Sequence, residues 1–319
     1  MNLYEFGRVR LNVHHVFSIF QVSRDEGRNR IQPNSADHFI NRAVDVTVTA
    51  LVTDPFYSEM VRFPRPNQLP HRKFARSRKL GAFQQACGAI DGTLITAHPP
   101  SHREGNFRDR KGGLSWNVLG ICDLDRRLCY VNAGWEGPEP DISIWYDCLR
   151  HEDIPIPQGY YLLGDAGFTL RCQVLTPYNG TAYHLAAWKR SRRQPATREE
   201  VYNHQHSSLR MPIEQVWGIM KARFKALRAG TYYAPAKQVQ VIYALCALQN
   251  FMSDNKDDCE PVPDDQDLLS GVGLDPDEPV ARRERNDPDA RSDPMVALRE
   301  KIADDNFARW EVIPATQPE

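Results

Sequence analysis

Four short apolar segments and one helical segment, in a fixed order, constrain the fold of this chain most strongly. Three of the apolar segments read as strands, over residues 83–91, 114–123 and 127–135. The turn Leu124-Asp125-Arg126 joins the last two, so the three strands are predicted to form an antiparallel meander. The broken stretch EGPEP leads to DISIWYDCLRH, a short helix, and QGYYLLGDAG is the fourth strand, ending at Asp165.

Two longer helical patterns follow. Pro212 suits the first turn of the first helix. Its apolar residues recur at steps of four and three, which predicts a buried stripe formed by Ile213, Trp217, Met220, Phe224 and Leu227. The second helix is AKQVQVIYALCALQNFM. Three strands, a helix, a strand and then helices is the order of an RNase H-like α/β fold, a mixed sheet flanked by helices. In that fold the first and fourth strands are neighbours.

We expect three regions along the chain. Residues 1–80 form a small helical region and connector, with a helix around Phe39–Val52 and then a Pro- and Arg-rich stretch. Residues 81–253 form the RNase H-like domain. Residues 254–319 form an acidic tail, predicted to be mostly disordered apart from a short helix near Met295–Trp310. Deletion of residues 260–319 is therefore expected to leave the fold intact.

Charge is distributed unevenly between these regions. The chain has a net charge of −1, but residues 254–319 hold 19 acidic and 8 basic residues, so the body before them is basic. A basic body favours a polyanionic partner such as nucleic acid, although mildly basic bodies with acidic tails are also common. The seven cysteines form no CxxC pair, which favours buried thiols over structural zinc. No apolar run suits a membrane span or a signal peptide.

Three acidic residues are the leading candidates for a reaction centre. Asp91 in GAIDGT and Asp165 in YYLLGDAG each follow an apolar strand, and Glu214 lies in the helical pattern RMPIEQVWGIMKARF. Two aspartates at strand ends and a glutamate on a helix are suited to holding two hard cations for phosphodiester cleavage. Each also has an ordinary interpretation, as a turn aspartate or as a glutamate at a helix N-terminus. Asp141, which starts a helix after Pro140, suits an N-cap and a metal ligand equally well.

Basic residues near these acids are candidates for contact with phosphate. Lys221 and Lys225 follow Glu214 at i+7 and i+11, and Gly218 at i+4 leaves space over its carboxylate. A second cluster is either a solvated loop or a phosphate-binding strip, and consists of Lys189, Arg190, Arg192 and Arg193. The chain contains no GxSxG elbow and no GxxxxGK[ST] loop, and His204 and His206 are more typical of surface histidines than of a metal site.

Residues from about 87 to 251 resemble the DDE endonuclease domain of PIF/Harbinger-type transposases and their domesticated relatives. The segments that carry the resemblance, in family order, are GAIDGT, FRDRKGGLSWNVLGICDLDRRLCYVNAGWEGPEPDISIW, YYLLGDAGF, VLTPYNG, NHQHSSLRMPIEQVWGIMKARFKAL and ALCALQNFM. The chain departs from the family pattern at Leu94, where histidine is usual, at Gln215, where arginine often follows the third acid, and at Trp116, where glutamine is common. The family's N-terminal helix-turn-helix region is poorly matched.

The resemblance implies an RNase H-like fold and a DDE site that binds a divalent cation, Mg²⁺ or Mn²⁺. Asp91 matches the family's first acid, Asp165 the second and Glu214 the third, and Asp141 matches a further aspartate often taken as an additional metal ligand. DNA as the substrate, the nucleus as the location, a Myb-like companion protein and a homo-oligomer are also implied.

The leading hypothesis is thus a metal-dependent DNA endonuclease, a hydrolase of the transposase-derived type. The alternative, from a different class, is a catalytically silent module that binds DNA or protein, and Leu94, Gln215 and the poorly matched N-terminus motivate it. A third reading is a metal-dependent hydrolase of a smaller phosphoester.

Overall fold

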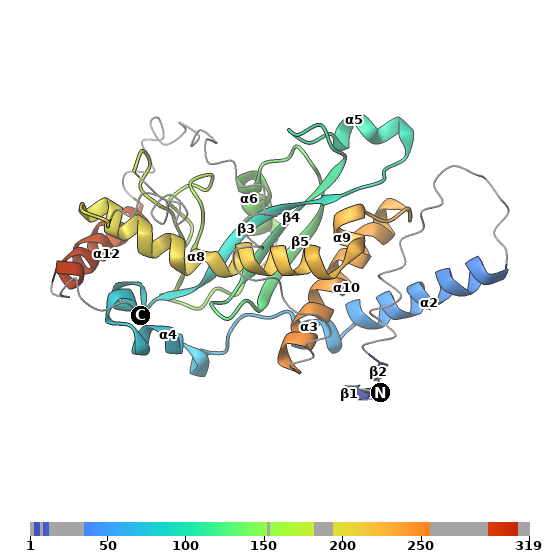
Figure 1. Cartoon of the computed structure of the whole chain (residues 1–319), viewed down its shortest axis with the longest axis horizontal. Coiled ribbons are helices and arrows are strands. Elements are labelled where there is room, and N and C mark those ends of the chain that lie inside the picture. The colour runs from blue at the N-terminus through green and yellow to red at the C-terminus, as the bar shows by residue number, and fades with distance from the viewer. Residues whose placement is uncertain are drawn as a thin grey trace.

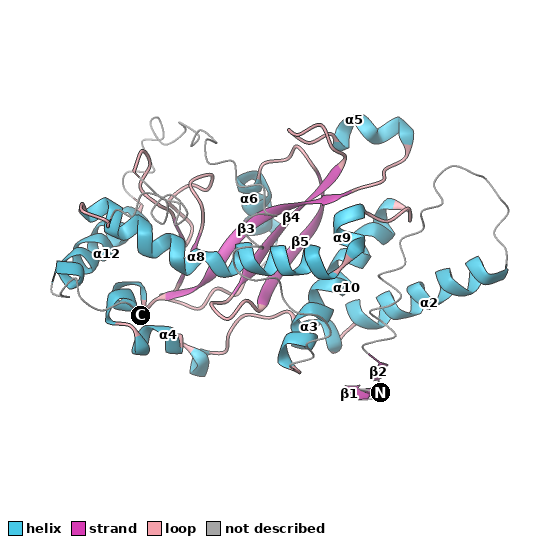
Figure 2. Ribbon diagram, in the orientation of Figure 1, coloured by secondary structure: helices cyan, strands magenta, loops and turns pink. Residues whose placement is uncertain are grey.

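A mixed five-stranded sheet forms the centre of the computed structural model, which describes residues 3–6, 9–12, 35–151, 154–181, 194–255 and 293–311. The strand order is β5-β4-β3-β6-β7 (Figure 2). Strands β3, β4 and β5 form the predicted antiparallel meander, whereas β6 pairs with β3 and β7 pairs with β6 in parallel. The strand bounds are β3 Ala86–Thr96, β4 Ser115–Cys122, β5 Leu128–Glu136, β6 Tyr161–Leu163 and β7 Val174–Leu175. The expected side-by-side placement of the first and fourth strands is confirmed.

The turn between β4 and β5 forms where the sequence predicts it. The Asp123 carboxylate accepts hydrogen bonds from the backbone N–H groups of Asp125 (2.8 Å) and Arg127 (2.9 Å). Arg126 has a φ of 69°, in the left-handed region that a tight reversal between antiparallel strands requires.

Helices cover both faces of the sheet (Figure 1). On one face α6 packs its buried Ile144, Trp145 and Cys148 against apolar residues of β3 and β4. On the other face, α8 runs across the strands and α10 lies beside it, in a larger core. The helix bounds are α2 Ser35–Val52, α3 Phe56–Met60, η1 Pro66–Gln68, α4 Arg72–Arg76, η2 Arg78–Phe83, η3 Ser101–Arg103, α5 Glu104–Phe107, α6 Asp141–His151, α8 Arg198–Arg223, α9 Lys225–Ala229, α10 Pro235–Asp254 and α12 Pro294–Glu311.

The long helix α8 differs from the sequence prediction at its start. Pro212 lies inside the helix rather than in its first turn, because a capping box begins the helix fourteen residues earlier. The Thr197 hydroxyl accepts from the Glu200 N–H at 3.2 Å, and the Glu200 carboxylate accepts in return from the Thr197 N–H at 3.3 Å. Glu214 is thus in the middle of α8, and its interpretation as an N-terminal-turn glutamate is wrong. The predicted apolar stripe is buried, but its last two members, Phe224 and Leu227, lie beyond the end of α8.

The predicted C-terminal helix is confirmed as α12, but it packs against the body of the protein. Met295, Ile302 and Ala303 are buried in the main core, and α12 contacts α8. Arg198 at the start of α8 pairs with Glu300 (2.7 Å) and with Asp304. The expectation that everything after residue 260 is separable from the fold is therefore wrong. The rest of the predicted disordered tail lies outside the described residues.

The N-terminal region contains strands that the sequence analysis missed. β1 (Leu3–Phe6) and β2 (Val9–Asn12) form an antiparallel pair. The predicted helix near Phe39–Val52 is confirmed as α2, whose Val44, Val48 and Leu51 are buried in the main core beside α10. The six cysteines within the described residues form no disulfide bond. In the part of the chain that the structure describes, none of the helices has the length and apolarity needed to cross a membrane.

Candidate functional site

Asp91 lies in the middle of β3, because this strand continues to Thr96 instead of ending at the aspartate as expected. Asp91 is directly opposite Gly120 of β4. Cross-strand partners share one face of a sheet, and the Gly120 position faces Trp217 of α8, since a Cβ added there would lie 2.3 Å from the indole. The Asp91 side chain therefore points to the face of the sheet that α8 covers.

Asp165 comes next to Asp91 through the parallel pairing of β6 with β3. The pairing ends at Ala89↔Leu163, and Asp165 follows two residues after the end of β6. The Asp165 carboxylate accepts a hydrogen bond from the Gly167 N–H at 2.9 Å. The negative charge of Asp165 contributes to raising the pKa of Asp91, which is consistent with the proximity of the two carboxylates.

Glu214 and Arg210 of α8 complete the cluster. Arg210 is buried, with a side chain only 5% exposed, and its Nη1 lies 3.3 Å from the Asp91 Oδ1. The other end of the guanidinium pairs with the Glu214 carboxylate. One arginine thereby links the first and third candidate acids. The sequence analysis did not select Arg210, although its i,i+4 spacing to Glu214 on a helix was a usable signal.

The electrostatics of the cluster favour bound cations. Burial raises the pKa of Asp91 well above its usual range, the Arg210 charge opposes this rise, and the Asp165, Asp141 and Glu214 charges add to it. Carboxylate oxygens are the donors that Mg²⁺ and Mn²⁺ prefer, so the chemistry of this set fits such ions. In the described parts of the chain, no three His, Cys, Asp or Glu side chains converge into a metal site, and Arg210 instead holds Asp91 and Glu214 in ion pairs.

Asp141 approaches β3 from the opposite face of the sheet. A Cβ added to Gly92 would lie 2.0 Å from the Asp141 Oδ1, so this carboxylate lies directly over the glycine. Asn117 donates to the same oxygen at 2.7 Å and also to the Glu139 carbonyl at 2.8 Å. Burial raises the pKa of Asp141, and hydrogen bonds from Asn117 and from the Gly92 backbone oppose the rise. These contacts favour a role for Asp141 in fixing the start of α6 against β3.

The two predicted lysines of the helix occupy different environments. Burial is the main cause that lowers the pKa of Lys221 to about 8, and the Asp91 charge opposes this lowering. Lys221 is therefore within electrostatic reach of the first acid. Lys225 is not on the same helix face, because α8 ends at Arg223 and Lys225 starts α9. The cluster Lys189, Arg190, Arg192 and Arg193 lies outside the described residues.

The two histidines of α8 make hydrogen-bond and packing contacts within the described parts of the chain. His206 is fully buried, not at the surface, and its Nε2 lies 2.9 Å from the Leu175 carbonyl oxygen. His204 packs near Trp310 of α12, with ring centroids 6.1 Å apart. Both histidines thus contribute to packing on the part of α8 that precedes the carboxylates.

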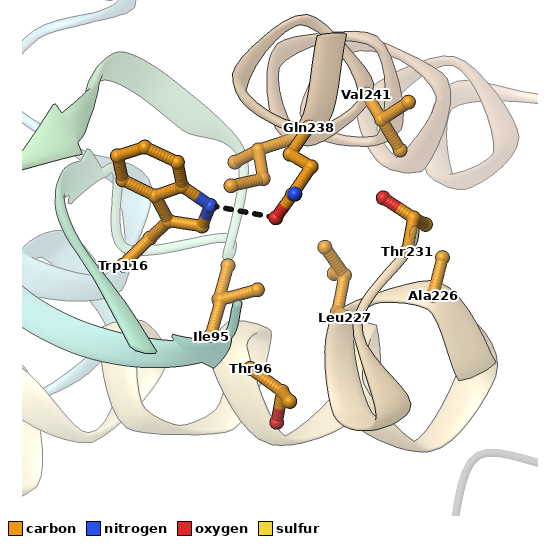
Figure 3. A pocket seen from close by; sticks show the side chains of 9 residues that line it. Ile95, Thr96, Trp116, Ala226, Leu227, Thr231, Gln238 and Val241 are labelled. Atoms are coloured by element: carbon orange, nitrogen blue, oxygen red, sulfur yellow. Dashed lines mark hydrogen bonds between the residues drawn. The ribbon is translucent and has the colours of Figure 1, made fainter. Parts of the chain in front are cut away.

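Trp116, one of the departures from the family pattern, serves the core. Its ring nitrogen donates to the Gln238 side chain at 3.1 Å, and both residues line a small cavity (Figure 3). The cavity is also lined by Ile95 and Thr96, which lie at the end of β3 beyond Asp91, and by Leu227 of α9. This cavity is therefore separate from the candidate site.

Comparison with known proteins supports a nuclease-like family. Residues 90–250, just over half of the chain, match the family described as DDE superfamily endonuclease. The nuclease-named HARBI1 of Rattus norvegicus is 26% identical over 199 residues, and that of Homo sapiens is 26% identical over 205 residues; each match covers 60% of this chain and 53% of the relative. Protein ALP1-like of Arabidopsis thaliana is 25% identical over 225 residues, which cover 64% of this chain and 52% of that protein.

Each of these matches covers only part of this chain and part of the relative. This chain spans about half the length of the curated relatives it matches. No solved structure matches it significantly. The matched segment begins one residue before Asp91 and contains Asp165, Arg210 and Glu214. The chain belongs to the DDE superfamily endonuclease family.

Proposed function

We propose that this protein is a divalent-metal-dependent endonuclease that cleaves phosphodiester bonds in DNA. The observation that carries the proposal is the charged cluster around Asp91: Arg210 bridges the Asp91 and Glu214 carboxylates, and the Asp165 charge acts on Asp91. Burial and three neighbouring negative charges make the ionised form of Asp91 unfavourable. A bound divalent cation carries more positive charge than the Arg210 guanidinium. It would therefore reduce the repulsion between the Asp91 carboxylate and the neighbouring acids, as in other oxygen-donor metal sites.

Asp91, Asp165 and Glu214 would hold the metal, Mg²⁺ or Mn²⁺. When bound, two such ions would activate the attacking water and stabilise the departing oxygen of a phosphodiester. Asp141 would support the set from the other face, by its hydrogen bonds to Asn117 and Gly92. Its alternative role as a metal ligand would require a different arrangement of that side chain.

Arg210 and Lys221 have distinct tasks in this proposal. Arg210 neutralises part of the charge of Asp91 and Glu214, which stabilises the folded carboxylate cluster. Lys221 places a cation in the last turn of α8, within electrostatic reach of Asp91, where it can attract a phosphate group toward the acids. With DNA as the substrate, the nucleus is the proposed location, with a Myb-like companion and a homo-oligomeric assembly as further proposals.

Plasmid nicking tests the proposed activity directly. The parent protein should nick supercoiled DNA with Mg²⁺ or Mn²⁺, and Asp165→Asn should lose roughly 100-fold or more of this rate, because an electrostatic contribution of several kcal/mol disappears. Asp305→Asn, at an exposed position of α12, is the matched control that removes the same charge and should nick normally. A folded parent that binds DNA without nicking would instead support the catalytically silent module.

A further inference from the structure

A loop between β3 and β4 brings a second group of cations toward the carboxylates. Residues 108–114 lead from α5 into β4, and a bridge between Arg108 and Leu114 closes the loop. Phe107, which precedes the loop, is fully buried and packs edge-to-face on Trp116 of β4, with ring centroids 4.6 Å apart. The start of the loop is therefore anchored to the sheet by buried aromatic packing.

Asp109 fixes the conformation of this loop from inside. Its Oδ1 accepts from the backbone N–H groups of Lys111 at 2.9 Å and Gly113 at 3.0 Å, and its Oδ2 accepts from the Ser115 hydroxyl at 2.9 Å. The Asp109 N–H also donates to the Gly113 carbonyl at 2.8 Å. The negative charge of Asp109 is thus turned toward the loop's own donors, whereas Arg110 and Lys111 are exposed.

The base of the loop lies beside the end of α8 and near Asp141. Ser115, which Asp109 holds, pairs with Thr96 of β3, whose hydroxyl donates to the Arg228 carbonyl at 2.8 Å, in the short helix α9 that follows α8. Asn117, two residues after Ser115, donates to Asp141 at 2.7 Å.

The Arg110 charge acts on Asp141, where it counters the rise in pKa that burial causes. The Lys111 charge acts on Lys221 and helps burial to lower its pKa, against the effect of Asp91. Positive charge therefore continues from Lys221, in the last turn of α8, outward to the loop. Lys111 and Lys221 repel each other, and a phosphate between them would relieve that repulsion.

We propose that the Asp109-braced loop and Lys221 form one phosphate-binding edge that holds the DNA backbone beside the carboxylates. This inference rests on the proposed function. Contacts to phosphates carry no base information but fix the position of the duplex, which is what a cleavage site requires. Because the hydrogen bonds to Asp109 already order the loop backbone in the unbound protein, DNA binding costs little conformational entropy in the loop.

The test compares two double variants that remove equal charge. Arg110→Gln/Lys111→Gln removes the loop cations, and Arg76→Gln/Lys301→Gln removes exposed cations from α4 and α12, which lie far from the loop (Figure 1). Binding of the full chain to a duplex of about 20 base pairs is measured by fluorescence anisotropy with Ca²⁺ over a salt series. The loop variant should bind roughly tenfold more weakly and lose about two units of log–log salt slope, because each lost phosphate contact removes about 0.9 unit.

Each outcome decides the proposal. A salt slope that falls in the loop variant but not in the control supports it. Equal slopes in the two variants, or a parent that does not bind the duplex, would overturn it. The nicking assay distinguishes failure of this proposal from failure of the proposed function. If the parent nicks plasmid and both variants bind DNA equally well, the protein is a nuclease but the loop does not bind phosphate. If the loop variant binds DNA more weakly but the parent does not nick plasmid, the phosphate-binding loop is supported and the proposed nuclease activity is not.

Discussion

At the scale of single residues, the site depends on the missing side chain of Gly92. The Asp141 carboxylate, held by Asn117, lies where a Cβ would be, 2.0 Å from its built position. Gly92→Ala should therefore displace Asp141 and destabilise the fold by about 1–3 kcal/mol, as overpacking usually does. Denaturant unfolding measures this loss, and plasmid nicking should fall as well. Gly105→Ala is the control, since nothing lies within 4 Å of its added Cβ; an equal effect of both variants would contradict the argument.

A second prediction at this scale concerns His206. Burial is the main cause that lowers the pKa of His206 to about 3, far below the value of about 6.5 expected in the unfolded chain. The folded protein thus holds this ring neutral. Its contribution to stability is complete above pH 6.5 and declines as the pH falls below 6.5 toward 3, by about 1.4 kcal/mol per pH unit.

Unfolding measured at pH 7.0 and pH 5.5 checks this prediction. The parent should lose more stability than His206→Gln over this interval, because the glutamine has no ring to protonate. Parallel losses in the two proteins would show that His206 does not titrate in the unfolded state as expected. Burial raises the pKa of Asp91 and Asp141, but both acids are present in the parent and in His206→Gln, so their titration is common to the two proteins and cancels in the comparison.

At the scale of elements, α8 determines where the functional side chains lie. It carries Arg210, Glu214 and Lys221, and its start is fixed by the reciprocal bonds between Thr197 and Glu200. Thr197→Ala should cost about 1 kcal/mol of folding stability, the usual effect of losing an N-cap. Thr197→Ser keeps the hydroxyl and should recover most of this loss in the same unfolding measurement. A serine variant as unstable as the alanine variant would assign the effect to the lost methyl group instead.

At the scale of the whole molecule, the C-terminal helix joins the core from a distant part of the sequence. α12 buries Met295 and Ile302, and Arg198 of α8 pairs with its Glu300. Truncation after residue 255 should therefore lower the melting temperature by several degrees or more, since each buried side chain contributes roughly 1.5–3 kcal/mol. An internal deletion of residues 260–290 retains α12 and should melt closer to the parent. Equal melting of the parent and the truncated chain would show that α12 is dispensable.

Local patterns in the sequence predicted most of the elements around the site. Alternation and apolar runs identified β3, β4, β5 and the strand before Asp165, because these segments must bury apolar side chains in a sheet. The spacing of apolar residues likewise identified the helix that carries Glu214. The boundaries were less predictable: β3 continues past Asp91 because β4 pairs with it as far as Thr96, and local sequence does not reveal where a partner strand ends.

The sequence by itself determined which acids are available and the order of the elements that carry them. Only the tertiary structure decided that Arg210 lies between Asp91 and Glu214, that Asp141 reaches Gly92 from the opposite face, and that α12 packs on α8. The physical reason is that these contacts join residues from different elements, often far apart in the chain. Periodicity reports which side of an element is buried, whereas the partner on that side depends on how the elements pack.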